Sequence, residues 1–204
     1  MIRDKILTWN TKELLAPNGN TLCLGVPALY FFTQTGSSSA LPTPNKGEFR
    51  QVDSAGYQYV WECQDLDWSN AFSGTTATGP ILVLGSKNTN TILSTSSMFQ
   101  GCQWLQQFVL GSSGYPESNF RKVVSSDAMF AECSNLHTCG AAKGFTSALE
   151  NCAVMYYGCR SCVNVQDQYQ KLVLCNPRNH DQCFTGCTYN MEYIPASWGG
   201  SGNG

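Results

Sequence analysis

Eleven cysteines and two histidines are the residues of this 204-residue chain whose types could hold a metal ion, form disulfides or act as nucleophiles. The pair Cys159-x2-Cys162, followed by Cys183-x3-Cys187, has the spacing of a zinc ribbon, because two closely spaced pairs of thiolates can complete a tetrahedral site. The same cysteines could instead form disulfides, or they could be small apolar residues in a core.

The register of these cysteines favours the core. Five aromatic residues recur at intervals of 27, 31, 26 and 28 residues: Phe72, Phe99, Phe130, Tyr156 and Phe184. Four cysteines each stand three residues after one of these aromatic residues: Cys102, Cys133, Cys159 and Cys187. Cys162 occupies the place of Leu105, and Cys183 that of Met98. We therefore expect packed thiols, no metal ion and no disulfide framework, which the odd number of cysteines also disfavours.

The two histidines give no sign of catalysis. His137 and His180 fall in different repeats, beside Asn135 and Asp181, and no convergent partner is visible for either one. The sequence contains no Gly-x-Ser-x-Gly elbow, no phosphate-binding loop and no His-Glu-x-x-His motif. The sequence thus predicts a protein that is not an enzyme and needs no cofactor.

The elements that would position these residues repeat along the chain. The best copies of the pattern are 98–105, 129–136 and 155–162, with a weaker copy at 183–190 and a degenerate one at 71–74. Self-similarity with a period of 20 to 50 residues is typical of units that bury their apolar faces only by stacking on one another. We expect the aromatic residues and the cysteines to form ladders in the interior.

The pattern Met-Phe-x-Gly-Cys-x-x-Leu at 98–105, with its copy at 129–136, resembles the BspA-like leucine-rich repeats. The resemblance implies an α/β fold, a right-handed leucine-rich-repeat-like solenoid with a short strand and a helical turn in each repeat. It also implies a binding or adhesive role, because such repeats occur in bacterial surface proteins, in parasites and in phage-encoded proteins. The chain departs from the pattern at four positions: Thr75, Glu132, Cys162 and Cys183.

Three regions are expected. Residues 1–66 show no repeat and contain β-like runs, which predicts a β-rich N-terminal cap or docking unit. Residues 67–193 hold about five repeats. Residues 194–204 form a Gly-rich tail, whose composition predicts flexibility.

Composition excludes several classes of function. Charged residues make up 13% of the chain and the formal net charge is −2, so the basic patch of a nucleic-acid-binding protein is missing. The N-terminal residues lack the apolar core of a signal peptide, and the most apolar stretch, 22–32, is too short to cross a bilayer. We expect no export signal and no membrane span, with a place in a virion if the gene is a phage gene, and otherwise a cytoplasmic or non-classically exported protein.

The leading hypothesis is a non-enzymatic repeat module that binds a protein or a cell-surface glycan in an attachment or assembly role. Aromatic side chains outside the core register are the candidate anchors: Trp104, Tyr115, Tyr157, Tyr169 and Tyr189. The alternative is a virion structural protein, such as a phage capsid-decoration, fibre or tail-associated subunit, which would contact other virion proteins.

Overall fold

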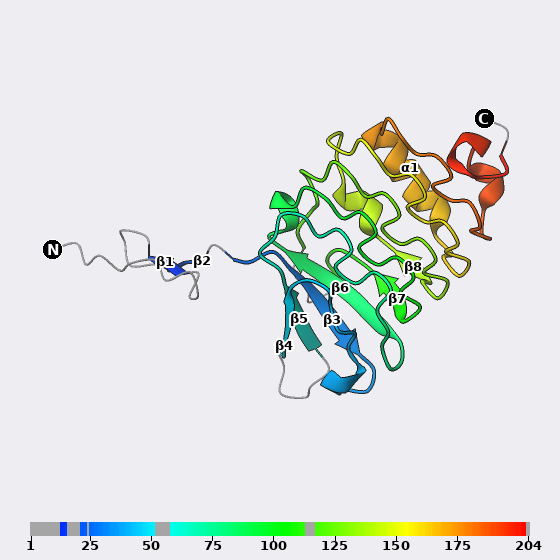
Figure 1. Ribbon diagram of the computed structural model, residues 1–204. Helices are drawn as coiled ribbons and strands as arrows, with labels where there is room; N and C mark the ends of the chain where they lie inside the picture. Colours follow the sequence, from blue (N-terminus) through cyan, green and yellow to red (C-terminus); the bar gives the residue numbers. More distant parts are fainter. Residues whose placement is uncertain (1–12, 16–20, 24, 52–57, 113–116, 203–204) are drawn as a thin grey trace.

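One mixed sheet of six strands holds most of the regular structure (Figure 1). The computed structural model describes residues 13–15, 21–23, 25–51, 58–112 and 117–202. Within them the strands follow the order β4-β5-β3-β6-β7-β8. Their bounds are Ala28–Thr33 for β3, Glu48–Gln51 for β4, Gln58–Glu62 for β5, Ile81–Lys87 for β6, Leu105–Phe108 for β7 and Thr138–Cys139 for β8.

The sheet is antiparallel on one side and parallel on the other. Strand β3 pairs antiparallel with both β5 and β6, and β4 pairs antiparallel with β5. Strands β6, β7 and β8 are parallel. Alternate residues of these strands, such as Leu29 and Phe31 in β3 or Ile81 and Val83 in β6, are fully buried. This period of two buries one face of the sheet in the core.

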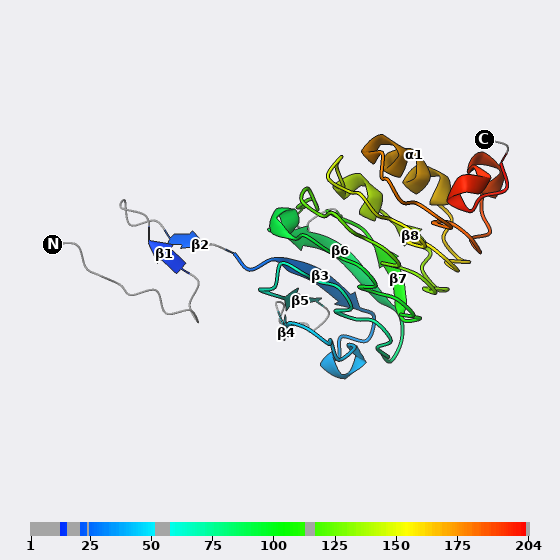
Figure 2. The same cartoon turned by 45° about the horizontal axis from the view of Figure 1, so that its top comes forward.

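Strands β1 (Glu13–Leu15) and β2 (Thr21–Cys23) form a separate antiparallel pair. Figures 1 and 2 draw this pair apart from the six-stranded sheet in two orientations, with helix α1 (Val165–Cys175) and the 3-10 helix η5 (Ala196–Trp198) at the opposite end of the molecule.

The repeated aromatic residues lie in five tight turns that stack on one another. We call them the aromatic turns and number them 1 to 5: residues 67–75, 94–102, 125–133, 151–159 and 179–187. At each step four backbone N–H groups of one turn donate to four carbonyl oxygens of the next. Between turns 1 and 2, for example, Phe72 N–H donates to the carbonyl oxygen of Met98 at 2.8 Å. All of these bonds point the same way along the stack.

Two residues of every aromatic turn have left-handed backbone conformations. One stands two residues before the aromatic residue and has φ between 47° and 61°: Asn70, Ser97, Ala128, Val154 and Gln182. The other stands two residues after it and has φ between 61° and 82°: Gly74, Gly101, Glu132, Gly158 and Gly186. Glycine adopts this region without strain, which explains why four of the five second positions are Gly.

The aromatic side chains form one continuous stack in the core. The centroids of adjacent rings from Phe72 to Phe184 are 5.2 to 5.8 Å apart, and the interplanar angles are 1° to 19°. Phe31 from β3 lies 5.3 Å from Phe72 at one end, and Trp198 lies 6.4 Å from Phe184 at the other. The stack therefore joins the antiparallel part of the sheet to the last residues of the chain.

The cysteine ladder lies beside the aromatic stack. The thiols of Cys102, Cys133, Cys159 and Cys187 each donate to the carbonyl oxygen of the aromatic residue in the preceding turn, at 2.9 to 3.2 Å. In turn 1 the corresponding residue is Thr75, whose hydroxyl bonds the carbonyl oxygen of Phe72 at 2.7 Å. This position therefore requires a small side chain that both fills space and donates a hydrogen bond.

Helix α1 (Val165–Cys175) follows turn 4 and is the one α-helix of the described residues. It buries Val165, Gln168, Leu172 and Cys175, which lie on one face. The described residues also contain five short 3-10 helices: η1 (Ser38–Ala40), η2 (Thr89–Thr91), η3 (Ala141–Gly144), η4 (Met191–Tyr193) and η5 (Ala196–Trp198). Among the described residues no helix combines the length and apolarity needed to cross a membrane.

The predicted right-handed leucine-rich-repeat-like solenoid is wrong. The described chain has a mixed six-stranded sheet and a single α-helix, whereas that fold needs a strand and a helical turn in each repeat. The parallel strands shorten from seven residues in β6 to four in β7 and two in β8. After turn 4 the chain forms helix α1 from Val165 instead of the expected strand. The copies meet mainly through their turns.

The tail that was expected to be flexible instead packs against turn 5. Trp198 is 7% exposed, its carbonyl oxygen accepts from Phe184 N–H at 2.9 Å, and its ring stacks on His180 with centroids 4.1 Å apart. Its glycines permit this close packing, because a side chain on Gly199 would collide with Thr185 and one on Gly200 with the backbone of Ile194. The glycines of this segment thus allow close packing and do not make it mobile.

Candidate binding groove

A groove with a volume of about 650 Å³ follows the loops that leave the first four aromatic turns. These loops lead into β6, β7, β8 and α1, so the stacking of the turns places equivalent loops next to one another. The groove is lined by Gly74, Thr75, Thr76, Ala77, Gly79, Pro80, Gly101, Gln103, Trp104, Gln106, Asn135, His137 and Ser161.

Trp104 forms part of the wall of this groove. Its side chain is 5% exposed, and its ring packs edge-on against Phe99 with the centroids 6.1 Å apart. The indole N–H donates to the carbonyl oxygen of Thr75 at 3.0 Å, which ties the loop of turn 1 to that of turn 2. Trp104 therefore fixes the shape of the groove and does not present an open aromatic face to a ligand.

Carboxamide groups hold neighbouring loops together. Asn135 Nδ2 donates to the carbonyl oxygen of Gln103 at 2.7 Å. The side chain of Gln103 donates to the carbonyl oxygen of Glu132 in turn 3 and accepts from the hydroxyl of Ser134, just after that turn. Because these amides already have partners, they fix the loops in place.

The exposed side chains of Gln106 and His137 in the groove are free to bind. The backbones of Gln106 and His137 are joined by a 2.8 Å bond from His137 N–H to the carbonyl oxygen of Gln106, and the carbonyl oxygen of His137 accepts from Val163 at 3.0 Å. Neither side chain has a hydrogen-bond partner within the described part of the chain. Backbone bonds thus fix both residues, while the carboxamide and the imidazole remain available to a ligand.

The lining offers hydrogen bonds but no charged acid–base pair. It has amide, hydroxyl and imidazole groups, and no Asp, Glu, Lys or Arg is among the lining residues. Across the described ranges no three His, Cys, Asp or Glu side chains gather as metal ligands would. This arrangement suits recognition of a neutral polar ligand better than acid–base chemistry.

The cysteines are poor nucleophiles in this fold. The ten cysteines from Cys63 to Cys187 are free and buried. Burial raises the pKa of Cys102 to about 12, and it raises the pKa of Cys133 and Cys159 well above the ordinary value of 9.0. Since the thiolate is the reactive form, these groups stay protonated and unreactive near neutral pH.

The aromatic residues predicted to bind do not gather at one site. Trp104 alone lines the groove. Tyr157 is half-buried in turn 4, and Tyr169 on α1 packs against Phe184 and Trp198, with ring centroids 6.3 and 5.4 Å away. Tyr189 is 47% exposed, and Tyr115 lies outside the described residues.

Sequence reasoning missed Gln106 and treated His137 as an isolated loop residue. A signal existed for Gln106, because it is a polar residue inside the extended run 105–110 and alternation on a strand turns it away from buried Leu105. No sequence signal places His137 beside Gln106, since the two lie 31 residues apart and meet only through the stacking of the turns.

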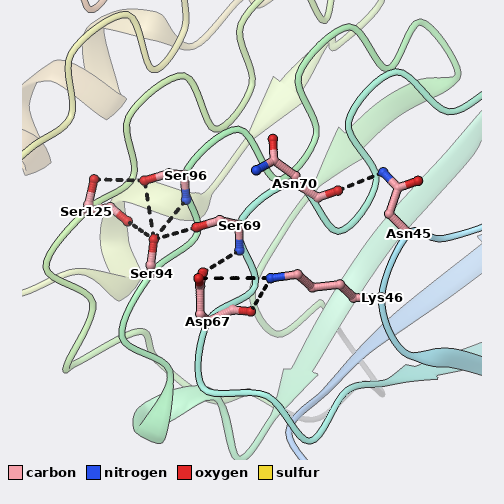
Figure 3. Close-up of polar contacts among 8 residues, drawn as sticks. All are labelled: Asn45, Lys46, Asp67, Ser69, Asn70, Ser94, Ser96 and Ser125. Atoms are coloured by element: carbon pink, nitrogen blue, oxygen red, sulfur yellow. Dashed lines mark hydrogen bonds and ion pairs between the residues drawn. The ribbon is translucent and has the colours of Figure 1, made fainter.

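A second polar feature is a row of serines on turns 1 to 3 (Figure 3). The hydroxyls of Ser69 and Ser94 are 2.8 Å apart, those of Ser94 and Ser96 are 3.3 Å apart, and those of Ser96 and Ser125 are 2.8 Å apart. Because these hydroxyls bond one another, the row links turns together and leaves few groups for a ligand.

The first turn ends the stack with a polar cap, also drawn in Figure 3. Asn45 donates through Nδ2 to the carbonyl oxygens of Asn70 (2.8 Å) and Ser73 (3.1 Å), and Lys46 Nζ donates to that of Asp67 (2.8 Å). Burial acts to raise the pKa of Asp67, but hydrogen bonds from Ser69 and the charge of Lys46 outweigh burial and lower it. Asn45 and Lys46 thus satisfy carbonyl groups that no preceding turn could reach.

Comparisons with known proteins give no relative: no protein-family model, no curated protein and no solved structure matches this chain. The resemblance to BspA-like repeats therefore stays a prediction.

Proposed function

We propose that this chain is a non-enzymatic binding module that holds a neutral, hydroxyl-rich ligand, a glycan, in the groove along the first four aromatic turns. The observation that carries the proposal is the composition of the groove: its free groups are a carboxamide on Gln106, an imidazole on His137 and nearby hydroxyls, all fixed by stacked loops. Carboxamides both donate and accept hydrogen bonds, as sugar hydroxyls do.

A glycan fits this groove better than a protein does. Protein interfaces draw most of their binding energy from buried aromatic or arginine anchors. The groove has no arginine, and its one aromatic residue, Trp104, is already packed. A charged partner would also meet no opposite charge along the lining. An adhesive or attachment role is then the consequence of holding a surface sugar.

The test is titration of the full chain with neutral oligosaccharides of glucose, galactose and N-acetylglucosamine, followed by NMR or calorimetry. We expect saturable binding by at least one of them, with Gln106→Ala and His137→Ala each weakening it about tenfold, because each removes a hydrogen bond worth about 1.4 kcal/mol. Gln100→Ala is the matched control, because Gln100 is also exposed and does not line the groove.

Two results would count against the proposal. One is the absence of saturable binding to every neutral sugar tested while a protein partner binds; the other is equal loss of affinity in Gln100→Ala and Gln106→Ala. The alternative of a virion structural subunit stays a prediction from the sequence, and light-scattering mass together with electron microscopy of the native source tests it. A fixed oligomer or a place in a particle would favour that alternative.

A further inference from the structure

A second hollow, of about 340 Å³, lies at the far end of β6 from the groove. Pro80 before β6 lines the groove, and Lys87 at the end of β6 lines the hollow, so the two sites are about 20 Å apart along the strand. The hollow is lined by Ser86, Lys87, Asn88, Asn90, Glu117, Ser118, Asn119 and Arg121. A ligand in one site would therefore not fill the other.

Hydrogen bonds hold the two walls of this hollow together. Ser86 Oγ donates to the carbonyl oxygen of Ser118 at 2.6 Å and accepts from Ser118 N–H at 3.1 Å. Ser118 Oγ accepts from Thr89 N–H at 3.0 Å. The hydroxyl proton of Ser118 has no acceptor among the described residues, so this rigid frame still has a hydrogen bond to donate.

The hollow has more donors than acceptors. Its one carboxylate, Glu117, is paired with Lys143 at 3.0 Å. Lys87 and Arg121 are exposed, and neither has an ion-pair partner in the parts of the chain that are described. The Nδ2 atom of Asn88 is buried beside Gly25, out of reach of a ligand in the hollow. Two unpaired cations and the free hydroxyl proton of Ser118 on a rigid frame match an anion with several oxygens.

We propose that this hollow binds an oxyanion group, a sulfate, phosphate or carboxylate, between Lys87 and Arg121. Arginine suits this role because its planar guanidinium can donate two hydrogen bonds to one such group. The group can belong to a free inorganic anion or to an acidic sugar, and the chemistry of recognition is the same. This site is independent of the proposed glycan groove.

The experiment is a titration of the full chain with sodium sulfate at constant ionic strength, in which backbone amide NMR shifts are recorded at each step. We expect saturable shifts confined to residues near 86–90 and 117–121. Arg121→Ser and Lys87→Ser should each weaken sulfate binding about tenfold, or about 1.4 kcal/mol, because each removes a charge-assisted hydrogen bond.

Lys122→Ser is the matched control, because Lys122 is the exposed neighbour of Arg121 and does not line the hollow. Equal loss in Lys122→Ser and Arg121→Ser, or shifts that never saturate, would mean simple charge screening and would overturn the proposal. Parallel titrations with inorganic phosphate and with glucose 6-sulfate then separate the two sources. Tighter binding of the sulfated sugar would identify an acidic glycan as the source, and equal affinities would identify a free anion.

Discussion

At the scale of single residues, the left-handed backbone conformation repeated in each turn is unfavourable for some of the residues that adopt it. Val154 has φ 47°, although β-branched residues strongly disfavour the left-handed region. The equivalent residue of turn 1 is Asn70, a type that tolerates this conformation. Turn 4 is therefore expected to store strain at Val154.

We expect Val154→Asn to raise the free energy of unfolding by about 1 kcal/mol, because it relieves left-handed strain. The reciprocal change, Asn70→Val, should lower it by a similar amount. Urea unfolding of both variants measures these differences. A destabilised Val154→Asn together with an unchanged Asn70→Val would show that backbone strain does not control this position.

The thiols make stability depend on alkaline pH. Burial raises the pKa of Cys102 to about 12, and burial followed by the charge of Cys162 raises that of Cys187 to about 12, against an ordinary value of 9.0. Above pH 9 the unfolded chain loses these protons and the folded chain keeps them. The free energy of unfolding should therefore fall between pH 9 and pH 12, and below pH 9 the contribution of these thiols is constant.

Each such thiol should contribute a slope of about 1.4 kcal/mol per pH unit in that window. Denaturant unfolding under reducing conditions at pH 8, 9.5 and 10.5 measures the slope. Cys102→Thr, which copies Thr75 of turn 1, should make it shallower by the share of one thiol. An identical slope in this variant would rule out Cys102 as a source of the pH dependence.

Sequence reasoning identified the aromatic and cysteine positions because their residue types repeat in register. It could not identify the left-handed residues before the aromatic ring, because Asn70, Ser97 and Val154 share no side-chain property. Only the glycines after the ring, such as Gly101, carry a visible signal. The backbone imposes the same conformation at each copy whether or not the side chain favours it.

At the scale of elements, a substitution in the polar cap on the first turn tests how much that cap stabilises the stack. Asn45→Ala removes the two side-chain hydrogen bonds to the carbonyl oxygens of Asn70 and Ser73. We expect a loss of about 1 to 2 kcal/mol in the free energy of unfolding, similar to the loss of a helix cap.

The matched control is Asn90→Ala, because Asn90 is exposed and its side chain has no hydrogen bond to any described residue. Thermal and urea unfolding of the two variants give the comparison. Equal stabilities would mean that water satisfies these carbonyl groups as well as Asn45 does.

The strands and the helix show what the sequence could reveal. Strands β6 and β7 begin at two runs of the sequence that are rich in apolar residues, 81–84 and 105–110, although β7 ends at Phe108. The segment after Cys162 was expected to be a strand and begins a helix. Its buried residues Val165, Leu172 and Cys175 have the spacing of one helix face. This helical spacing was overlooked because every repeat was assumed to have a strand at this place.

At the scale of the whole molecule, one aromatic stack runs from β3 to the tail, so the tail is part of the core. Trp198→Ala should lower the free energy of unfolding by about 3 kcal/mol or more, because it leaves a cavity beside Phe184 and Tyr169. Tyr193→Ala is the control, since Tyr193 is 58% exposed in the same segment. Similar small effects of both changes in chemical unfolding would show that the tail is not a structural element.

The hydrogen bonds between turns all share one direction, and this has a consequence for how such a chain can evolve. Each turn offers carbonyl oxygens to the turn before it and N–H groups to the turn after it. Every internal copy therefore has the same pair of complementary faces, whatever its side chains. Duplication or loss of one copy in the gene leaves the neighbouring faces matched, and only the ends, at Asn45 and Trp198, need a sequence of their own. The number of copies can therefore change while every backbone N–H and carbonyl group between turns keeps a hydrogen-bond partner.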